Sequence, residues 1–236
     1  MSSNSISDNL QTVQADLLAA CLAADRAPGQ VALLAVSKTC SAEQVLQAAH
    51  AGQRAFGENY VQEAIDKMHA VQALDPQLAL EWHFIGPIQS NKTRQIAENF
   101  AWVHSVDREK IAVRLSEQRP RELPPLNMCL QINISGEASK SGVPPAEALA
   151  LARKIAALPG LQLRGLMAVP EPSEDIAEQR AAFRQLRELQ QLIRSHGVAL
   201  DSLSMGMSAD MQSAIAEGST IVRIGTAIFG KRNYAK

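Results

Sequence analysis

The stretch VALLAVSKTCSAEQV, residues 31–45, places an apolar run directly before a polar turn and the start of a helix. The first six residues are all apolar, which is typical of a strand buried on both faces in a parallel sheet. Ser41 and Gln44 have the spacing of a helix capping box, and Gly52 marks the expected end of that helix. The stretch therefore predicts one strand–helix unit, with Lys38 directly after the strand.

This unit recurs along the chain. The apolar runs are VALLAVS (31–37), RAFGE (54–58), EWHFIG (81–86), WVHSVD (102–107), NMCLQINI (127–134), LRGLMAV (163–169), SLSMGM (202–207) and IVRIGTAIF (221–229). Helical patterns lie between them, and strands that alternate with helices pair in parallel. Eight such units in roughly 200 residues predict an α/β fold of the closed (β/α)8 or TIM-barrel type. An open doubly wound sheet is the alternative, but no GxGxxG turn follows the first run.

A helix is expected before the first of these units. Apolar residues recur at helical spacing from Ile6 to Cys21, and Pro28-Gly29 ends the pattern. We expect residues 1–28 to form an additional N-terminal helix that packs on the barrel. Because no low-complexity segment or linker divides the rest, residues 1–236 are expected to form a single domain.

The composition argues against several classes of protein. With 46% hydrophobic residues and a net charge of −1, the chain is expected to be globular and to lack the basic surplus that nucleic acid requires. Its three cysteines form no CxxC pair, which argues against disulfides and zinc and indicates a reducing compartment. No signal peptide or membrane-spanning run is present in the sequence. We therefore expect a cytoplasmic protein with no membrane contact and no metal.

Lys38 is the first candidate for chemistry. Active sites of (β/α)8 barrels lie at the C-terminal ends of the strands, where Lys38 is expected. A desolvated lysine amine can attack a carbonyl and form a Schiff base. The alternative is a lysine that simply extends past the strand end into solvent.

The seventh and eighth runs add a buried cation and small polar residues. Arg223 interrupts the Ile and Val residues of STIVRIGTAIFG, so its guanidinium needs either a carboxylate partner or an anionic ligand. Gly225 and Thr226 follow at the strand end, where N–H groups and a hydroxyl can hold a phosphate. Ser208 lies where the seventh run gives way to a helix, which its hydroxyl can cap, or it can bind the same phosphate. Phosphate sites after strands 7 and 8 are frequent in this barrel class.

An amine, a phosphate site and a buried arginine together suggest pyridoxal 5'-phosphate as cofactor. Its aldehyde would join Lys38 as a Schiff base, and Arg223 would face the pyridine nitrogen. An Asp or Glu there would keep the nitrogen protonated and make the ring a strong electron sink. An arginine donates a hydrogen bond instead, which leaves a weaker sink suited to a narrow chemistry or to none. A class I aldolase that uses Lys38 directly on a sugar phosphate is a further alternative.

Four other residues are weaker candidates. Asn59 ends the second run and could hydrogen-bond the cofactor, although a plain turn residue would look the same. His83 and His104 lie in the third and fourth runs, where a histidine with satisfied hydrogen bonds in the core is the commoner case. Lys140, in a loop near the expected barrel mouth, is a second possible amine.

Several motifs resemble those of a known family. LLAVSKT, FGENYVQE, WHFIGPIQSNK, RGLMAVP, LSMGMSADM and GSTIVRIGTAIFG are similar to those of the pyridoxal phosphate homeostasis proteins, from about Val31 to Phe229. The resemblance implies the fold of the alanine racemase N-terminal domain, a (β/α)8 barrel preceded by a helix. It also implies cofactor-binding roles for a set of matching positions: Lys38, Asn59, Ser208, Arg223, Gly225 and Thr226.

The resemblance implies a carrier rather than an enzyme. Members of this family have no firmly established catalytic activity and are thought to bind, store and deliver the vitamin B6 coenzyme and to balance B6 vitamers. We therefore expect no catalytic residue, and we expect apo forms of pyridoxal phosphate enzymes as partners.

The alternative is a pyridoxal phosphate-dependent amino-acid racemase of the alanine racemase type. Such an enzyme needs a second proton-transfer group, a tyrosine from a C-terminal β-domain across a dimer. Here the sequence ends with FGKRNYAK soon after the eighth run, and its tyrosines are Tyr60 and Tyr234. We therefore expect at most weak side reactions, and a monomer.

Overall fold

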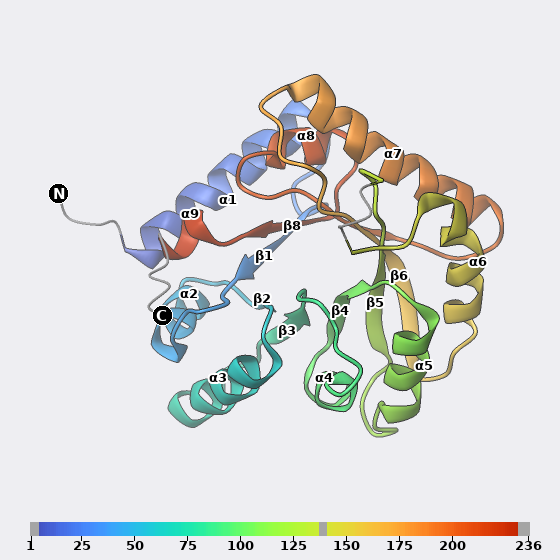
Figure 1. The fold of residues 1–236 in the computed structure, drawn as a ribbon. Coiled ribbons are helices and arrows are strands. Elements are labelled where there is room, and N and C mark those ends of the chain that lie inside the picture. The colour runs from blue at the N-terminus through green and yellow to red at the C-terminus, as the bar shows by residue number, and fades with distance from the viewer. Residues whose placement is uncertain (1–4, 137–140, 231–236) are drawn as a thin grey trace.

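A computed structural model describes residues 5–136 and 141–230, so Lys140 and Tyr234 lie outside the described residues. Within these ranges, eight parallel strands close into a barrel in sequence order, and the last pairs with the first (Figure 1). The strands are β1 (Ala32–Val36), β2 (Ala55–Glu58), β3 (Glu81–Phe84), β4 (Trp102–Val106), β5 (Leu126–Gln131), β6 (Leu161–Met167), β7 (Ser202–Ser204) and β8 (Ile221–Ile224). The predicted (β/α)8 barrel is confirmed.

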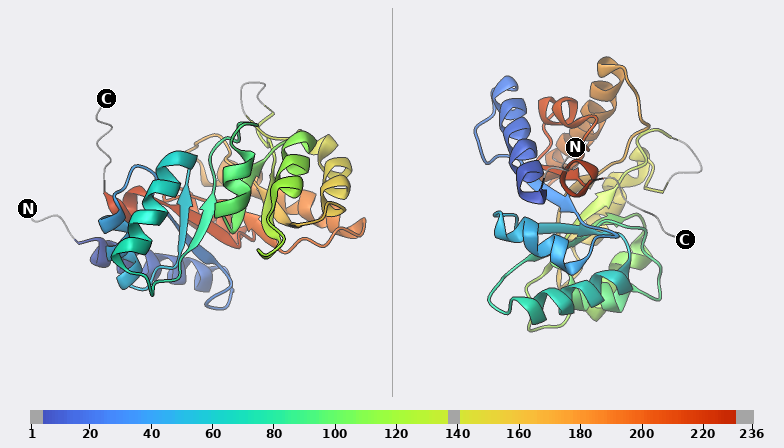
Figure 2. Two further views of the ribbon diagram at one scale, coloured as in Figure 1. Left: turned by 90° about the horizontal axis from the view of Figure 1, so that it is seen from below. Right: turned by 90° about the vertical axis from the view of Figure 1, so that its left-hand side faces the viewer.

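Helices surround the barrel (Figure 2). They are α1 (Ile6–Ala23), α2 (Ala42–His50), α3 (Val61–Leu74), α4 (Thr93–Asn99), α5 (Glu109–Gln118), α6 (Pro145–Ala156), α7 (Ile176–Ser195), α8 (Met211–Ala216) and α9 (Thr226–Phe229). Among the described residues, no helix combines the length and the apolar character that crossing a membrane requires.

The last apolar run, residues 221–229, continues past its strand. The strand β8 ends at Ile224, so Gly225 follows the strand end as expected, and the rest of the run forms the helix α9, which begins at Thr226. The N–H groups of Ile228 and Phe229 both donate to the carbonyl of Gly225, which turns the chain at this point. Ile228 is fully buried and lies beside α1, so packing of this short helix, rather than strand pairing, buries the apolar residues.

The N-terminal helix α1 packs against α8, α9 and α2. Asn9 Nδ2 donates to the carbonyl of Ile228 at 3.0 Å, and Arg26 Nη1 donates to the carbonyl of Ile215 at 3.1 Å. The helix ends at Ala23, earlier than the predicted boundary at residue 28, because Asp25 adopts a left-handed conformation with φ of 54°. These contacts fix α1 beside the last strand of the barrel.

Strand side chains divide between two regions. On β8, Val222 and Ile224 join the apolar layer between strands and helices, whereas Ile221 and Arg223 alternate with them and face the barrel interior. The interior also contains a small apolar cluster, which consists of Leu34, Trp102, Cys129, Met167 and Ile221. Arg223 is therefore a cation in the middle of the fold.

Candidate functional site

Predicted site residues come together at the C-terminal ends of four neighbouring strands. Lys38 follows β1, Asn59 follows β2, Ser208 lies beyond β7 and Gly225 directly follows β8. Because β7, β8, β1 and β2 are consecutive in the closed barrel, these residues gather on one side of its mouth. Arg223 lies in β8 just below them.

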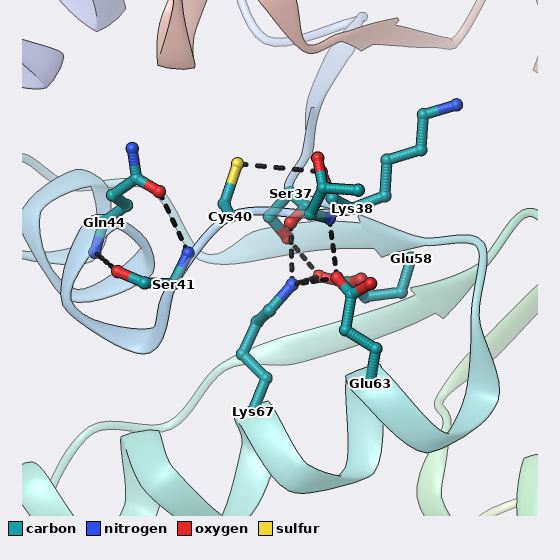
Figure 3. Close-up of polar contacts among 9 residues, drawn as sticks. Ser37, Lys38, Cys40, Ser41, Gln44, Glu58, Glu63 and Lys67 are labelled. Carbon is teal, nitrogen blue, oxygen red and sulfur yellow. Dashed lines mark hydrogen bonds and ion pairs between the residues drawn. The ribbon is translucent and has the colours of Figure 1, made fainter. Parts of the chain in front are cut away.

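The backbone on both sides of Lys38 is held by a cluster of charged residues (Figure 3). The carbonyl of Ser37 accepts a hydrogen bond from Lys67 Nζ at 2.7 Å, and the N–H of Thr39 donates to Glu63 Oε1 at 2.6 Å. Thr39 has φ of 62°, a strained conformation for a β-branched residue. The half-buried side chain of Lys38 points away from this cluster, and its amine makes no hydrogen bond or ion pair within the described chain.

Glu58 and Lys67 form a buried ion pair beneath Lys38. Glu58 Oε1 accepts hydrogen bonds from Lys67 Nζ at 2.8 Å and from the Ser37 hydroxyl at 2.6 Å. Burial raises the pKa of Glu58, and the charge of Lys67 opposes that shift. Lys67 also bonds Glu63 Oε1 at 3.0 Å, so three acceptors surround its amine. Of the two lysines, Lys38 is therefore the one whose amine is available to a ligand.

Sequence reasoning missed this ion pair. Glu63 and Lys67 have the i,i+4 spacing of an exposed helical pair, so the sequence pattern alone predicts a solvated Lys67. The available signal was Glu58, a carboxylate that ends an apolar strand and needs a buried partner.

Arg223 is buried, and all its hydrogen-bond acceptors among the described residues are neutral. Its Nη1 donates to the carbonyl and to the hydroxyl of Ser204, each at 2.7 Å, and its Nη2 donates to the carbonyl of Ala168 at 3.0 Å. The carboxylate ion pair considered from the sequence is not present among the described residues. Burial lowers the pKa of Arg223 to about 10, and the nearby charge of Asp210 opposes that shift. At neutral pH the guanidinium is charged, and no residue that the structure describes gives it an anionic hydrogen-bond partner.

Of the expected phosphate residues, Ser208 lies on the turn after β7, Gly225 directly follows β8, and Thr226 begins α9. Ser208 and Thr226 are exposed, and no hydrogen bond of the Gly225 or Thr226 N–H group is found in the described ranges. One interpretation of the sequence was that the Ser208 hydroxyl caps the following helix, but Ser208 does not cap α8. The residue before the helix is Asp210, whose Oδ1 instead accepts the N–H of Met207 at 2.6 Å. The Ser208 hydroxyl is thus not committed to the helix.

Asn59 supplies an orphaned polar atom at the same mouth. Its Oδ1 is buried and has no hydrogen-bond partner in the part of the chain that the structure describes. A Cβ atom at Gly86 would overlap the backbone of Asn59, so the glycine allows the chain after β3 to pack closely against Asn59. Buried amide oxygens are normally bonded, which makes a bound ligand the natural partner.

These features fit an anionic cofactor with an aldehyde. Within residues 5–136 and 141–230, four features at the mouth have no partner of the matching kind: the amine of Lys38, the cation of Arg223, the N–H groups of Gly225 and Thr226, and the amide oxygen of Asn59. Over the same described ranges, no group of three or more His, Cys, Asp and Glu residues could hold a metal ion.

Comparison with known proteins gives matches along nearly the whole chain. Residues 9–233 match the family model for the alanine racemase N-terminal domain. The pyridoxal phosphate homeostasis protein of Vibrio cholerae is 58% identical over 232 residues, which are 98% of each chain. That of Pseudomonas aeruginosa is 59% identical over 231 residues, 98% of this chain and 97% of the relative.

A solved structure also matches nearly the whole chain. PipY of Synechococcus elongatus PCC7942, solved with pyridoxal phosphate bound, superposes with a TM-score of 0.83 at 36% sequence identity. The match covers 95% of this chain and 100% of that one.

Proposed function

The chain belongs to the alanine racemase N-terminal domain family and, within it, to the pyridoxal phosphate homeostasis proteins, and on that premise we propose that it binds pyridoxal 5'-phosphate and balances the supply of the coenzyme and other B6 vitamers. The observation that carries the proposal is that Lys38, directly after β1, and Arg223, in the adjacent strand β8, offer an amine and a buried cation that have no anionic partner in the described part of the chain. The PipY structure with its bound coenzyme supports the same assignment.

Each residue at the mouth has a role in this proposal. Lys38 would hold the coenzyme's aldehyde as a Schiff base, a reversible link that keeps a reactive group from other amines. Arg223 would donate a hydrogen bond to the pyridine nitrogen. The phosphate would be held by Ser208, Gly225 and Thr226, and the orphaned amide of Asn59 would bond a polar group of the coenzyme.

An arginine at the ring nitrogen restricts the chemistry that the bound coenzyme can support. With its pKa at about 10, Arg223 remains a charged donor at neutral pH and does not pass a proton to the ring nitrogen. The full electron-withdrawing power of a protonated ring is then not developed, so the bound coenzyme is a weaker electron sink, suited to a narrow chemistry or to none. We therefore propose a carrier without catalytic activity, with no amino-acid racemase turnover beyond side reactions.

The remaining parts of the proposal concern the cell. The protein would work in the cytoplasm as a monomer and pass its coenzyme to apo forms of pyridoxal phosphate enzymes. Sedimentation velocity would test the monomer, for which we expect a mass near 25.5 kDa.

Delivery would be tested by mixing an apoenzyme with the loaded protein and, in parallel, with the same concentration of free coenzyme, and comparing the rates of activation. Faster activation by the loaded protein is expected, and a rate that equals that of free coenzyme at every concentration would contradict direct transfer.

One experiment tests the binding role. The protein is incubated with pyridoxal 5'-phosphate, its visible spectrum is recorded, and borohydride reduction is followed by peptide mapping. We expect a coloured protein labelled at Lys38, and no label in Lys38→Ala. A label on Lys67, or no uptake of the coenzyme at all, would contradict the proposal, and the second result would favour the sugar-phosphate aldolase. Assays with L- and D-alanine would reveal a racemase.

A further inference from the structure

A continuous line of hydrogen-bonded side chains runs through the barrel from Arg223 to its opposite end. Arg223 Nη1 lies 2.7 Å from Ser204 Oγ, which lies 2.7 Å from His104 Nδ1. His104 Nε2 lies 2.9 Å from His83 Nδ1, and His83 Nε2 lies 2.8 Å from Glu81 Oε1. The line crosses β8, β7, β4 and β3, and only Glu81, at the start of β3, has an exposed side chain.

With both imidazoles neutral, the two ends of this line fix the positions of its protons. Arg223 can only donate, so Ser204 Oγ accepts from it and directs its own proton to His104 Nδ1. At the other end the Glu81 carboxylate only accepts, so His83 carries its proton on Nε2 and accepts at Nδ1. His104 Nε2–H then donates to His83, which leaves Nδ1 of His104 to accept the Ser204 proton. Every N–H and O–H in the line is directed toward Glu81.

Electrostatics support this arrangement. Burial lowers the pKa of His104 well below its usual range, and it also lowers that of His83, so neutral rings are favoured near pH 7. The hydrogen bond from His83 is the main cause that lowers the pKa of Glu81, which keeps that carboxylate ionised. A charged His104 would place a second cation beside Ser204 and Arg223.

We propose that Ser204, His104 and His83 form a positioning relay for Arg223, which holds the guanidinium in place for the coenzyme's ring nitrogen. This inference rests on the proposed function. The His104 acceptor turns the Ser204 proton away, so that a lone pair of Ser204 Oγ faces Arg223. Hydrogen bonds in a chain polarise one another, and the anionic end at Glu81 strengthens that acceptor.

A purely structural role does not explain the line. The neighbouring interior positions are apolar, and His83 already stacks on Trp102 with ring planes 3° apart, a contact that an aromatic hydrocarbon would also make. Buried polar side chains are costly unless every partner is present. Here every side chain in the line has its hydrogen-bond partner, and the line ends at Arg223, inside the barrel.

The first test needs no coenzyme. In protein labelled with ¹⁵N-histidine, long-range ¹H–¹⁵N spectra report the charge and tautomer of each imidazole. We expect His83 and His104 to be neutral with the proton on Nε2 at pH 7. A charged ring, or a proton on Nδ1 of either residue, would overturn the relay whether or not the protein binds pyridoxal phosphate.

The second test uses matched variants on one strand. Ser204→Ala removes the relay's acceptor, whereas Ser202→Ala removes a buried hydroxyl on the same strand that bonds Asp201. Because hydrogen bonds to charged groups carry more than an average hydrogen bond, we expect about tenfold weaker pyridoxal phosphate binding and a shifted absorbance band in Ser204→Ala only. Equal affinity and spectra in the two variants would overturn the positioning role.

A third comparison separates positioning from packing at His104. His104→Phe keeps the ring volume but loses the acceptor, whereas His104→Asn places an amide oxygen near the former Nδ1 position. We expect His104→Phe to weaken coenzyme binding several-fold and His104→Asn to recover part of the loss, although Asn packs less well. The opposite order would overturn the relay. A wild-type protein that takes up no coenzyme would instead contradict the proposed function, and the imidazole tautomers would still decide whether the relay exists.

Discussion

Lys38 and Lys67 show how partners, rather than residue type, decide what a side chain can do. Both lie at the C-terminal end of the barrel, and both contact the same turn. Lys67 has three acceptors around its amine and is buried, so it serves as a structural cation. Lys38 has its backbone fixed on both sides, while no residue in the described ranges bonds its amine. Lys67 thereby helps to hold the backbone that orients Lys38.

A prediction at this scale concerns Arg223. Arg223→Gln removes the only charged donor that the proposal places at the pyridine nitrogen. A hydrogen bond to a charged group contributes about 1.5–3 kcal/mol, so binding of pyridoxal phosphate should weaken about 10- to 100-fold. Titration followed by absorbance measures the change. Arg164→Gln is the control, because that arginine lies over Trp102 and bonds Asp201 near the strand starts. An unchanged affinity in Arg223→Gln would mean that this arginine does not contact the coenzyme.

Single residues were predictable where the sequence pattern restricts them. Lys38 and Arg223 stand out because a charge within or after an apolar strand needs a reason, and their placement at the barrel mouth and in its interior follows from the strand pattern. Glu58 follows the same logic but was overlooked. The partners of Ser204 could not be predicted, because they depend on which side chains of β3, β4 and β7 meet inside the barrel, and register is set by tertiary packing.

At the scale of elements, the Glu58–Lys67 pair joins β1, β2 and α3. Lys67→Met leaves the carboxylate of Glu58 buried without its cation, and breaking such a pair from one side costs about 3–5 kcal/mol. We expect that loss in the free energy of unfolding, measured with urea. The double variant Glu58→Gln/Lys67→Met should be more stable than Lys67→Met alone, because no unpaired charge remains.

An exposed pair provides the control for this prediction. Lys154 and Glu109 are bonded at 2.6 Å but their side chains are 60% and 49% exposed, so Lys154→Met should change stability little. A loss in Lys67→Met no larger than that in Lys154→Met would contradict the structural role given to the buried pair.

The contact between β6 and β7 depends on one glycine. A Cβ atom at Gly165 would overlap the backbone of Ser202, which cannot move without separating the strands. At Gly57 the nearest atoms are side-chain ends, 3.1 Å away on Ile85 and 3.2 Å away on Leu34, which can shift. Gly165→Ala should therefore cost about 1–3 kcal/mol of unfolding free energy and more than Gly57→Ala, as thermal and urea unfolding would measure. Equal losses would contradict this account.

Elements were predicted well where periodicity and capping agree, and less well where packing decides. The capping box of Ser41 and Gln44 is present at the start of α2. The apolar residues after Gly225 have no pattern that separates a strand from one turn of helix. Their burial against α1, a contact between the two ends of the chain, makes them helical. Similarly, β7 ends at Ser204, earlier than the end of its apolar run at residue 207, and Gly206 adopts a left-handed conformation with φ of 99°.

At the scale of the whole molecule, the repeat of strand and helix was sufficient to predict a closed barrel. The motifs were also sufficient to predict the family, and the comparisons confirm it. Closure itself involves contacts that no local pattern contains. The connection between α8 and β8 is held from one side by Arg26, which donates to the carbonyls of Ile215 and Ser219, and from the other by α7. The last strand is thereby fixed next to the first.

Glu217 is the residue through which α7 holds this connection. Its carboxylate is buried and accepts from Arg180 at 2.8 Å, Arg184 at 3.0 Å and Arg187 at 2.9 Å. Burial alone would raise the pKa of Glu217, but the hydrogen bonds from Arg184 and Arg180 and the charge of Arg187 outweigh it, so the pKa lies below the usual 4.5. The folded state therefore favours the ionised form.

This lowered pKa gives the closure of the barrel a pH dependence. Stabilisation by Glu217 is complete above pH 4.5 and is lost as the pH falls through the lowered pKa, because protonation then removes the charge that three arginines share. Glu217→Gln should be less stable than the wild type at pH 7, and the gap should narrow as urea unfolding is repeated down to pH 3. Glu98→Gln, at a half-exposed pair with 3.8 Å between Arg94 and Glu98, should show no such gap. A gap for Glu217→Gln that stays constant across this range would mean that the arginines contribute by packing alone and that charge does not hold the last strand in place.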